Sequence, residues 1–475
     1  MTTHPQIIQG GMGVAVSNWS LARAVSSLGQ LGVVSGTALA VILSRRLQMG
    51  DPGGHMRRAL ENFPVPAVAR RVLADHFVPG GKKPEAPFRG VPLPGLKPAP
   101  ALVDLTVTAN FVEVFLAKHG HSGPVGINFL EKVQFPTLPS LYGAMLAGVD
   151  YVLMGAGIPL AIPGALDRLA ADEPVELKID VPGSTPGKPF LSRFDPRAFH
   201  GGPSLRLRRP RFLGIVSSST LAVTLARKAS GRVDGFVIEG ATAGGHNAPP
   251  RGPMHLDEAG EPVYGERDAP DLAAFRELGL PFWLAGSYGE PGRLADALAL
   301  GAVGVQAGTV FAACEESGIT DDLKQQVIDL SREGHANVFT DPLASPTGFP
   351  FKVLQVEGSL SEAETYEARP RLCNLGYLRR AFSLPDGTLR YRCPAEPVDE
   401  FVRKGGAEAD TVGRKCFCNG LLAAVGLARV EDGSPIEPPL LTAGNAVSRV
   451  AQFVKPGRRT YSAADVIERL LKPRG

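Results

Sequence analysis

The sequence predicts a (β/α)8 (TIM) barrel of the α/β class, with insertions and a C-terminal appendage. About eight short apolar runs each precede an amphipathic segment of helical period, and this alternation is typical of parallel βα units. Several of these runs end in glycine, as strands do where they open into a binding face. A count of about eight such units favours a closed barrel over an open sheet.

The first βα unit is the clearest. Residues 7–9 form a short strand that passes into glycines, and Ser17 and Asn18 then precede a helix over 21–28. Serine and asparagine are favoured at helix N-caps because their side chains accept a hydrogen bond from the first turn. Further strands are expected at residues 32–36, 124–130, 151–154, 175–180, 212–216, 233–239, 281–285 and 304–307.

The barrel is expected to span residues 1–345. The period is lost over about 44–100 and again over 182–210, where proline, glycine and arginine are frequent, so we interpret both as insertions. Residues 346–475 are expected to form a C-terminal α/β appendage with a hairpin around Leu384–Leu389.

Composition excludes several classes of protein. A net charge of +3 over 475 residues gives no case for nucleic-acid binding. Five cysteines do not make a secreted disulfide framework, and the N-terminus lacks the pattern of a signal peptide. The apolar stretch 31–43 is too short to span a bilayer. We expect a cytoplasmic protein without a membrane partner, and oligomer formation is left open.

One glycine-rich stretch follows the buried strand 233–239 and includes a histidine. Gly244 and Gly245 let backbone N–H groups approach a ring or a phosphate, and His246 follows at the carboxyl end of the strand. A tight turn with a surface histidine explains the stretch equally well when it is taken alone. Two further glycine-ended strands favour a site.

Those two strands end in Gly286-Ser287 and Gly308-Thr309. Backbone N–H groups, two hydroxyls and the following helix N-termini suit an anion, although each motif alone could be a helix cap. No Gly-Lys-Ser/Thr motif is present, so we expect the phosphate of a bound cofactor rather than a transferred one.

An ordered set of motifs resembles the nitronate monooxygenase (2-nitropropane dioxygenase) family, over roughly residues 5–345. The set is Gly10–Gly13, Asn128, Ala243–His246, Ala285-Gly286 and Gly304–Thr309. The resemblance implies a TIM barrel that binds FMN and oxidises alkyl nitronates with O₂, with His246 as the catalytic base. It implies ring contacts from Gly11, Met12 and Asn128, contacts to the phosphate and ribityl chain from Gly245, Gly286, Ser287, Gly308 and Thr309, and Gln306 close by.

Two departures from the family pattern leave the substrate open. Residues 247–252 replace a short turn after the histidine, and Ser287 stands where a second glycine is usual. The same motifs are similar to FMN-dependent enoyl-(acyl carrier protein) reductases, which would use NAD(P)H and an enoyl thioester. Basic runs at Arg206–Arg211 and Lys82-Lys83 could then dock an acidic acyl carrier protein. A third interpretation is a flavin-binding accessory subunit without catalysis.

Four cysteines lie close together in the C-terminal part: Cys373, Cys393, Cys416 and Cys418. They could hold zinc or an iron–sulfur cluster, but the Cys-x-Cys pair lacks the usual spacing of a zinc knuckle. We favour buried apolar thiols and assign no metal ligand.

Overall fold

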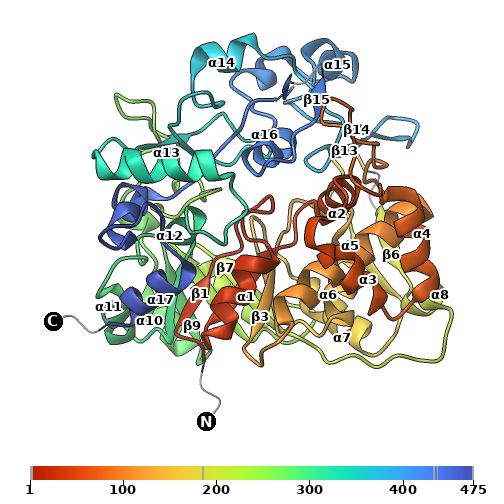
Figure 1. Ribbon diagram of the computed structural model, residues 1–475, viewed down its shortest axis with the longest axis horizontal. Coiled ribbons are helices and arrows are strands. Elements are labelled where there is room, and N and C mark those ends of the chain that lie inside the picture. Colours follow the sequence, from red (N-terminus) through yellow and green to blue (C-terminus); the bar gives the residue numbers. More distant parts are fainter. Residues whose placement is uncertain (1–3, 185–186, 432–433, 436, 473–475) are drawn as a thin grey trace.

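The computed structural model describes residues 4–184, 187–431, 434–435 and 437–472. Eight parallel strands close into a barrel, with β1 between β2 and β10, so the predicted TIM barrel is confirmed (Figure 1). The barrel strands are β1 (Ile7–Gln9), β2 (Leu31–Ser35), β3 (Val125–Leu130), β4 (Tyr151–Gly155), β7 (Arg211–Val216), β8 (Gly235–Glu239), β9 (Phe282–Ala285) and β10 (Gly304–Ala307).

One predicted barrel strand is wrong. Residues Val175–Lys178 form β5, which pairs antiparallel with β6 (Leu191–Phe194) as a hairpin outside the barrel. Buried and exposed residues alternate along β5, whereas β8 and β9 are buried on both faces along almost their whole length. A strand with one solvated face fits an antiparallel pair and not the barrel wall.

Helices cover the outside of the barrel. The predicted cap of the first helix is confirmed, because Asn18 Oδ1 accepts a hydrogen bond from the Leu21 N–H at 3.0 Å. The helices of the barrel region are α1 (Trp19–Ser27), α6 (Thr137–Leu146), α7 (Ile162–Ala170), α8 (Pro196–His200), α9 (Ser219–Lys228), η2 (Glu266–Asp268), α10 (Leu272–Glu277), α11 (Arg293–Ala299), α12 (Thr309–Ala312) and α13 (Asp321–Arg332).

The chain between β2 and β3 forms its own helical layer on one side of the barrel (Figure 1). Helix α5 within it is long and apolar enough to cross a membrane by composition, but 72% of its apolar window is buried inside the protein, where it packs on α2 and α6. It is thus placed as a core helix. The layer consists of α2 (Leu39–Gln48), η1 (Pro52–Gly54), α3 (His55–Glu61), α4 (Pro66–His76) and α5 (Pro100–Lys118).

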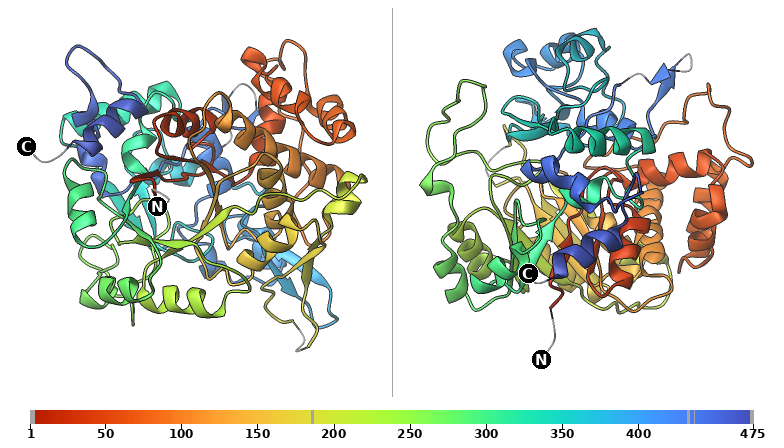
Figure 2. Two further views of the ribbon diagram at one scale, coloured as in Figure 1. Left: turned by 90° about the horizontal axis from the view of Figure 1, so that it is seen from below. Right: turned by 60° about the vertical axis from the view of Figure 1, so that its left-hand side comes forward.

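The C-terminal part lies beside the barrel and then returns to it. The predicted hairpin is present as β13 and β14, and α17 packs on α1 while η4 packs on α13 (Figures 1 and 2). The elements are β11 (Val338–Asp341), β12 (Phe351–Leu354), α14 (Ala363–Ala368), β13 (Arg380–Ser383), β14 (Leu389–Arg392), α15 (Val398–Arg403), η3 (Glu408–Thr411), α16 (Phe417–Ala424), β15 (Val430–Glu431), β16 (Ser434–Pro435), η4 (Asn445–Phe453) and α17 (Ala463–Leu471).

One hydrophobic core unites these parts. It runs from Ile7 in β1 to Leu470 in α17 and includes residues of the helical layer and of the C-terminal part. The β11–β12 hairpin crosses the division expected at residue 345. Division into a barrel and an appendage therefore stays a prediction from the sequence.

Candidate active site

A cavity of about 230 Å³ opens at the carboxyl ends of the barrel strands. This is the end at which barrel enzymes hold their ligands. The structure brings all of the sequence-predicted site residues to this one cavity, although their individual roles stay predictions. They are Gly11, Met12, Asn128, Gly245, His246, Gly286, Ser287, Gln306, Gly308 and Thr309.

Two side-chain oxygens in the cavity wall are buried without a hydrogen-bond partner. Asn128 donates its Nδ2–H to the Gly11 carbonyl at 3.1 Å, which leaves its Oδ1 unpaired, and Gln306 Oε1 is unpaired as well. An unpaired buried acceptor costs about 1–3 kcal/mol. Both oxygens therefore fit a ligand that presents N–H or O–H donors to this wall.

The wall formed by the ends of β9 and β10 carries the predicted phosphate contacts. Gly286 and Ser287 both have positive φ, of 93° and 58°, so the chain turns sharply directly after β9. Thr309 begins α12 directly after Gly308, and the first N–H groups of a helix lack partners within it. These features suit an anionic group, and the phosphate contacts themselves stay a prediction.

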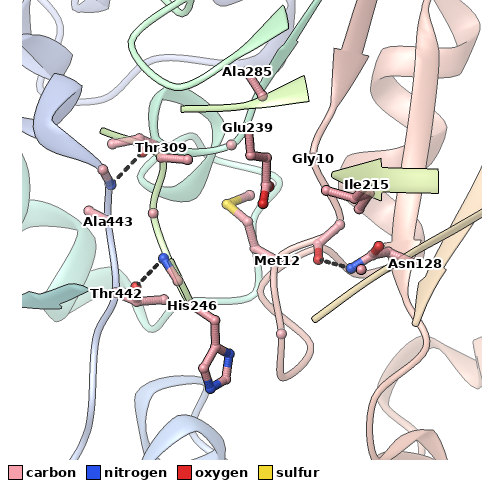
Figure 3. Close-up of a pocket in the computed structure, with 18 of the residues that line it drawn as sticks. Gly10, Met12, Asn128, Ile215, Glu239, His246, Ala285, Thr309, Thr442 and Ala443 are labelled. Carbon is pink, nitrogen blue, oxygen red and sulfur yellow. Dashed lines mark hydrogen bonds between the residues drawn. The ribbon is translucent and has the colours of Figure 1, made fainter. Parts of the chain in front are cut away.

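Residues near the C-terminus complete the cavity, and no pattern in the sequence predicted them. Thr442 Oγ1 accepts a hydrogen bond from the Gly245 N–H at 2.9 Å and donates to the Lys352 carbonyl at 2.6 Å. The Gly444 N–H donates to Thr309 Oγ1 at 2.8 Å. Figure 3 shows this segment running along the cavity beside Thr309 and the chain that carries His246. The C-terminal part thus contributes to the binding site itself.

His246 lies in an aromatic part of the cavity. Its Nε2 is 2.7 Å from Ser345 Oγ, and its ring centroid is 4.9 Å from that of Phe351 and 5.6 Å from that of Phe417. Burial lowers the pKa of His246 to about 4, because a charged imidazolium loses its hydration there. The ring is therefore neutral at pH 7.

Glu239 is a cavity residue that the sequence interpretation missed. It is the last residue of β8, and its carboxyl points into the space that Met12 also faces (Figure 3). Burial raises the pKa of Glu239 to about 7. A carboxyl that titrates near neutral pH inside a cleft is a candidate proton donor or acceptor. A charged residue ending an otherwise apolar strand was the available signal.

The basic run Arg206–Arg211 lies away from this cavity. Arg211 begins β7, so the run precedes the amino end of a barrel strand, opposite the site. Arg209 pairs with Asp167 and Asp234, and Arg208 pairs with Asp150. Two of the four arginines in the run thus pair with local aspartates, and the run does not flank the cavity mouth.

Comparisons with known proteins bear on the fold and the family. Residues 205–341 match the family model described as nitronate monooxygenase. Among curated proteins, none matches the sequence. The match to this family model supports an oxidoreductase activity.

Solved structures with a similar arrangement share little sequence with this chain. FabK from Thermotoga maritima is 17% identical with a TM-score of 0.45, over 99% of this chain and 92% of its own. Nitroalkane oxidase from Streptomyces ansochromogenes is 17% identical with a TM-score of 0.47, over 98% and 95%. The enoyl reductase domain of MlnA from Bacillus amyloliquefaciens is 12% identical with a TM-score of 0.48, over 97% and 91%. We draw no functional argument from similarity at this level. The match over residues 205–341 shows a similarity to nitronate monooxygenases and so confirms the family resemblance predicted from the sequence.

Proposed function

We propose that the protein is an FMN-dependent oxidoreductase that oxidises alkyl nitronates with O₂. The observation that carries the proposal is the pair of unpaired buried oxygens, Asn128 Oδ1 and Gln306 Oε1, in one glycine-lined cavity at the carboxyl ends of the strands. A flavin ring offers an N–H and its ribityl chain offers hydroxyls to such acceptors. The family match over residues 205–341 supports the same cofactor.

The shape of the cavity also fits this cofactor. Gly245 has φ of +81°, and a Cβ built there would meet no atom of the chain within 4 Å, so the backbone borders open space. Gly11 packs so closely on Asn128 that a Cβ would lie 2.4 Å from the Asn128 Cβ. Bound FMN would supply the electron acceptor. The phosphate would lie against Gly286, Ser287, Gly308 and Thr309.

His246 would remove the proton of a nitroalkane carbon acid. Its neutral ring can accept a proton on the nitrogen that does not face Ser345, whose hydroxyl holds the other nitrogen at 2.7 Å. The low pKa of His246 keeps the ring unprotonated at pH 7, but it also makes the ring a weaker base than one that titrates near the working pH. Phe351 and Phe417 exclude water around it and restrict the orientation of the ring.

The test separates proton removal from oxidation. We expect His246→Asn to retain FMN, to lose activity on neutral nitroalkanes and to keep activity on the nitronate anion, which needs no base. His255→Asn, on an exposed loop, serves as the control and should behave as the wild type. Full activity of His246→Asn on the neutral nitroalkane would contradict the assignment, and protein without bound FMN after refolding with excess cofactor would contradict the proposal as a whole.

A second candidate function is NAD(P)H-dependent reduction of an enoyl thioester. The observation that favours it is the apolar side of the cavity, where Leu378, Phe417 and Leu421 from the C-terminal part could cover an acyl chain. An acyl carrier protein would then be a partner, docked elsewhere than on Arg206–Arg211. Anaerobic NADPH should bleach the flavin absorbance near 450 nm quickly if this function is correct, and only nitronate should bleach it if the first is correct.

A further inference from the structure

A turn that follows β11 contacts the ring of His246 from outside the cavity. We call residues 345–348 the Ser345 turn. Ser345 is fully buried and does not line the cavity, and its Oγ is 2.7 Å from Nε2 of His246. Among the described residues, Nδ1 of His246 has no hydrogen-bond partner. Because His246 itself lines the cavity, Nδ1 is the ring nitrogen that is left for a ligand.

The Ser345 hydroxyl also contacts Thr347 in the same turn. Ser345 Oγ is 2.8 Å from Thr347 Oγ1, and it accepts a hydrogen bond from the Thr347 N–H at 3.2 Å. A serine hydroxyl donates one hydrogen bond and accepts two. Since the Thr347 N–H occupies one acceptor position, Ser345 donates either to His246 Nε2 or to Thr347 Oγ1, and it accepts from the other one.

The direction of these hydrogen bonds decides which nitrogen of the neutral His246 ring carries the proton. If Ser345 donates to Nε2, the proton of the ring is on Nδ1, and Nδ1 cannot act as a base. If Ser345 donates to Thr347, the proton of the ring is on Nε2, and Nδ1 keeps its lone pair.

The surroundings favour the second direction. In the first direction, the Nδ1–H of His246 lacks an acceptor among the described residues, in a part of the cavity lined by the rings of Phe351 and Phe417. In the second direction, the donor left over is the hydroxyl of Thr347, which is only half-buried. A donor without a partner costs less free energy near solvent than in an apolar surrounding.

The backbone holds the Ser345 turn and the ring in fixed positions. The Ser345 carbonyl accepts hydrogen bonds from Arg414 Nη1 at 2.7 Å and from the Gly348 N–H at 3.1 Å. Further along the chain, Phe351 forms an antiparallel bridge with His246, and their ring centroids are 4.9 Å apart. The hydroxyl and the imidazole therefore cannot separate without breaking these contacts.

A second turn of the same kind provides a comparison. Ser359 Oγ is 2.8 Å from Ser361 Oγ and accepts a hydrogen bond from the Ser361 N–H at 3.2 Å. Ser359 donates to the Val356 carbonyl at 2.7 Å, and a carbonyl can only accept. In the Ser345 turn, an imidazole nitrogen takes the place of this carbonyl, and such a nitrogen can donate or accept. The direction of the hydrogen bonds is thus open to a switch at Ser345 and not at Ser359.

We propose that Ser345 and Thr347 are positioning residues that set the tautomer of His246, with the proton on Nε2 and with Nδ1 as the basic nitrogen. Thr347 does not line the cavity and acts through Ser345, whose hydroxyl proton it accepts. The use of this tautomer in proton removal rests on the proposed function, but the tautomer itself is present without a substrate. Flavin content is measured on the same sample, so that failure of either proposal is recognised on its own.

The first experiment records the tautomer by nitrogen NMR in protein with isotope-labelled histidine. A ring nitrogen that carries a proton has a different chemical shift from one that does not, and His246→Asn assigns the signal among the nine histidines. We expect the proton on Nε2 in the wild type. Thr347→Val should move it to Nδ1, because Ser345 can then donate only to Nε2, and Thr347→Ser should restore the wild-type spectrum. Ser361→Ala removes the corresponding hydroxyl of the comparison turn and should leave His246 unchanged.

Two results of this experiment would overturn the proposal. One is a wild-type ring with its proton on Nδ1, which needs no variant to be observed. The other is a folded Thr347→Val protein whose proton stays on Nε2, with far-ultraviolet circular dichroism as the measure of folding. Ser345→Ala removes the partner of Nε2 and should give a mixture of both tautomers, so a single Nε2–H tautomer in that variant would also contradict the assignment.

The second experiment connects the tautomer to proton removal. Thr347→Val should lose activity on neutral nitroalkanes on the order of a hundredfold, should keep activity on the nitronate anion and should bind as much FMN as the wild type. Thr347→Ser should recover the lost activity. Equal losses on the neutral and the anionic substrate would overturn the positioning role of Thr347. If the wild type has the expected tautomer but oxidises neither substrate, the proposed function fails and the tautomer assignment stands.

Discussion

Replacing Glu239 by glutamine should make the stability of the flavin-free protein less dependent on pH. Burial raises the pKa of Glu239 from 4.5 to about 7. The folded protein therefore holds a proton that the unfolded chain has already released between those two values. The contribution of this residue to stability is fully present below pH 4.5 and is lost as pH rises through 7.

The size of the effect follows from the two pKa values. The folded protein binds more protons at Glu239 than the unfolded chain does. Integrated from pH 5 to pH 8, this difference is equivalent to one proton over about 1.8 pH units, and each such unit corresponds to about 1.4 kcal/mol. Wild-type protein should therefore lose about 2.5 kcal/mol of stability over this range relative to Glu239→Gln, whose amide cannot titrate.

Urea unfolding at pH 5 and pH 8 measures the difference. Glu258→Gln makes the same chemical change on an exposed loop and should give the wild-type dependence on pH. If the free energy of unfolding changes between pH 5 and pH 8 by the same amount in the wild type and in Glu239→Gln, the Glu239 carboxyl is hydrated in the folded protein. The account of a neutral carboxyl facing Met12 would then be refuted.

Three further changes test other parts of the structure. Gly245→Ala should weaken FMN binding in equilibrium dialysis, because the new Cβ enters the cavity. The control is Gly252→Ala, which has a similar positive φ on an exposed loop and should leave FMN binding unchanged. Thr442→Val should lower stability by about 1–3 kcal/mol in thermal unfolding, because the Gly245 N–H loses its acceptor; no loss would show that water replaces the hydroxyl. Asn18→Ala should cost about 1 kcal/mol in urea unfolding through the lost cap of α1, and an unchanged midpoint would contradict that role.

Much of the barrel could be predicted because local sequence determines it. Apolar runs that end in glycine identify parallel strands. Of the eight strands predicted after the first one, seven lie near observed barrel strands, and only residues 175–180 form a strand outside the barrel. That run alternates apolar and charged residues over its length, and the alternation itself is typical of a strand with one solvated face. The error came from counting the run as a βα unit in spite of this pattern.

The candidate site also has a part that the sequence predicts and a part that it does not. Its glycine-rich parts follow strands directly, so their order along the chain placed Gly11, Gly245 and Gly308 at one barrel end. Thr442 and Gly444 reach the same cavity from a region without a regular period. Contacts across such sequence separation depend on how the C-terminal part packs, which local patterns do not encode.

The two walls of the cavity are synthesised at different times, because the C-terminal segment returns to the barrel. All eight barrel strands lie before residue 308, but the wall containing Thr442 and Gly444 emerges from the ribosome much later. Domains generally begin to fold from their N-terminal side during synthesis. A barrel formed at that stage would present an open cleft, and the segment carrying Thr442 would close over a cofactor already seated. Under the proposed function, binding of the cofactor and completion of the chain would then be coupled.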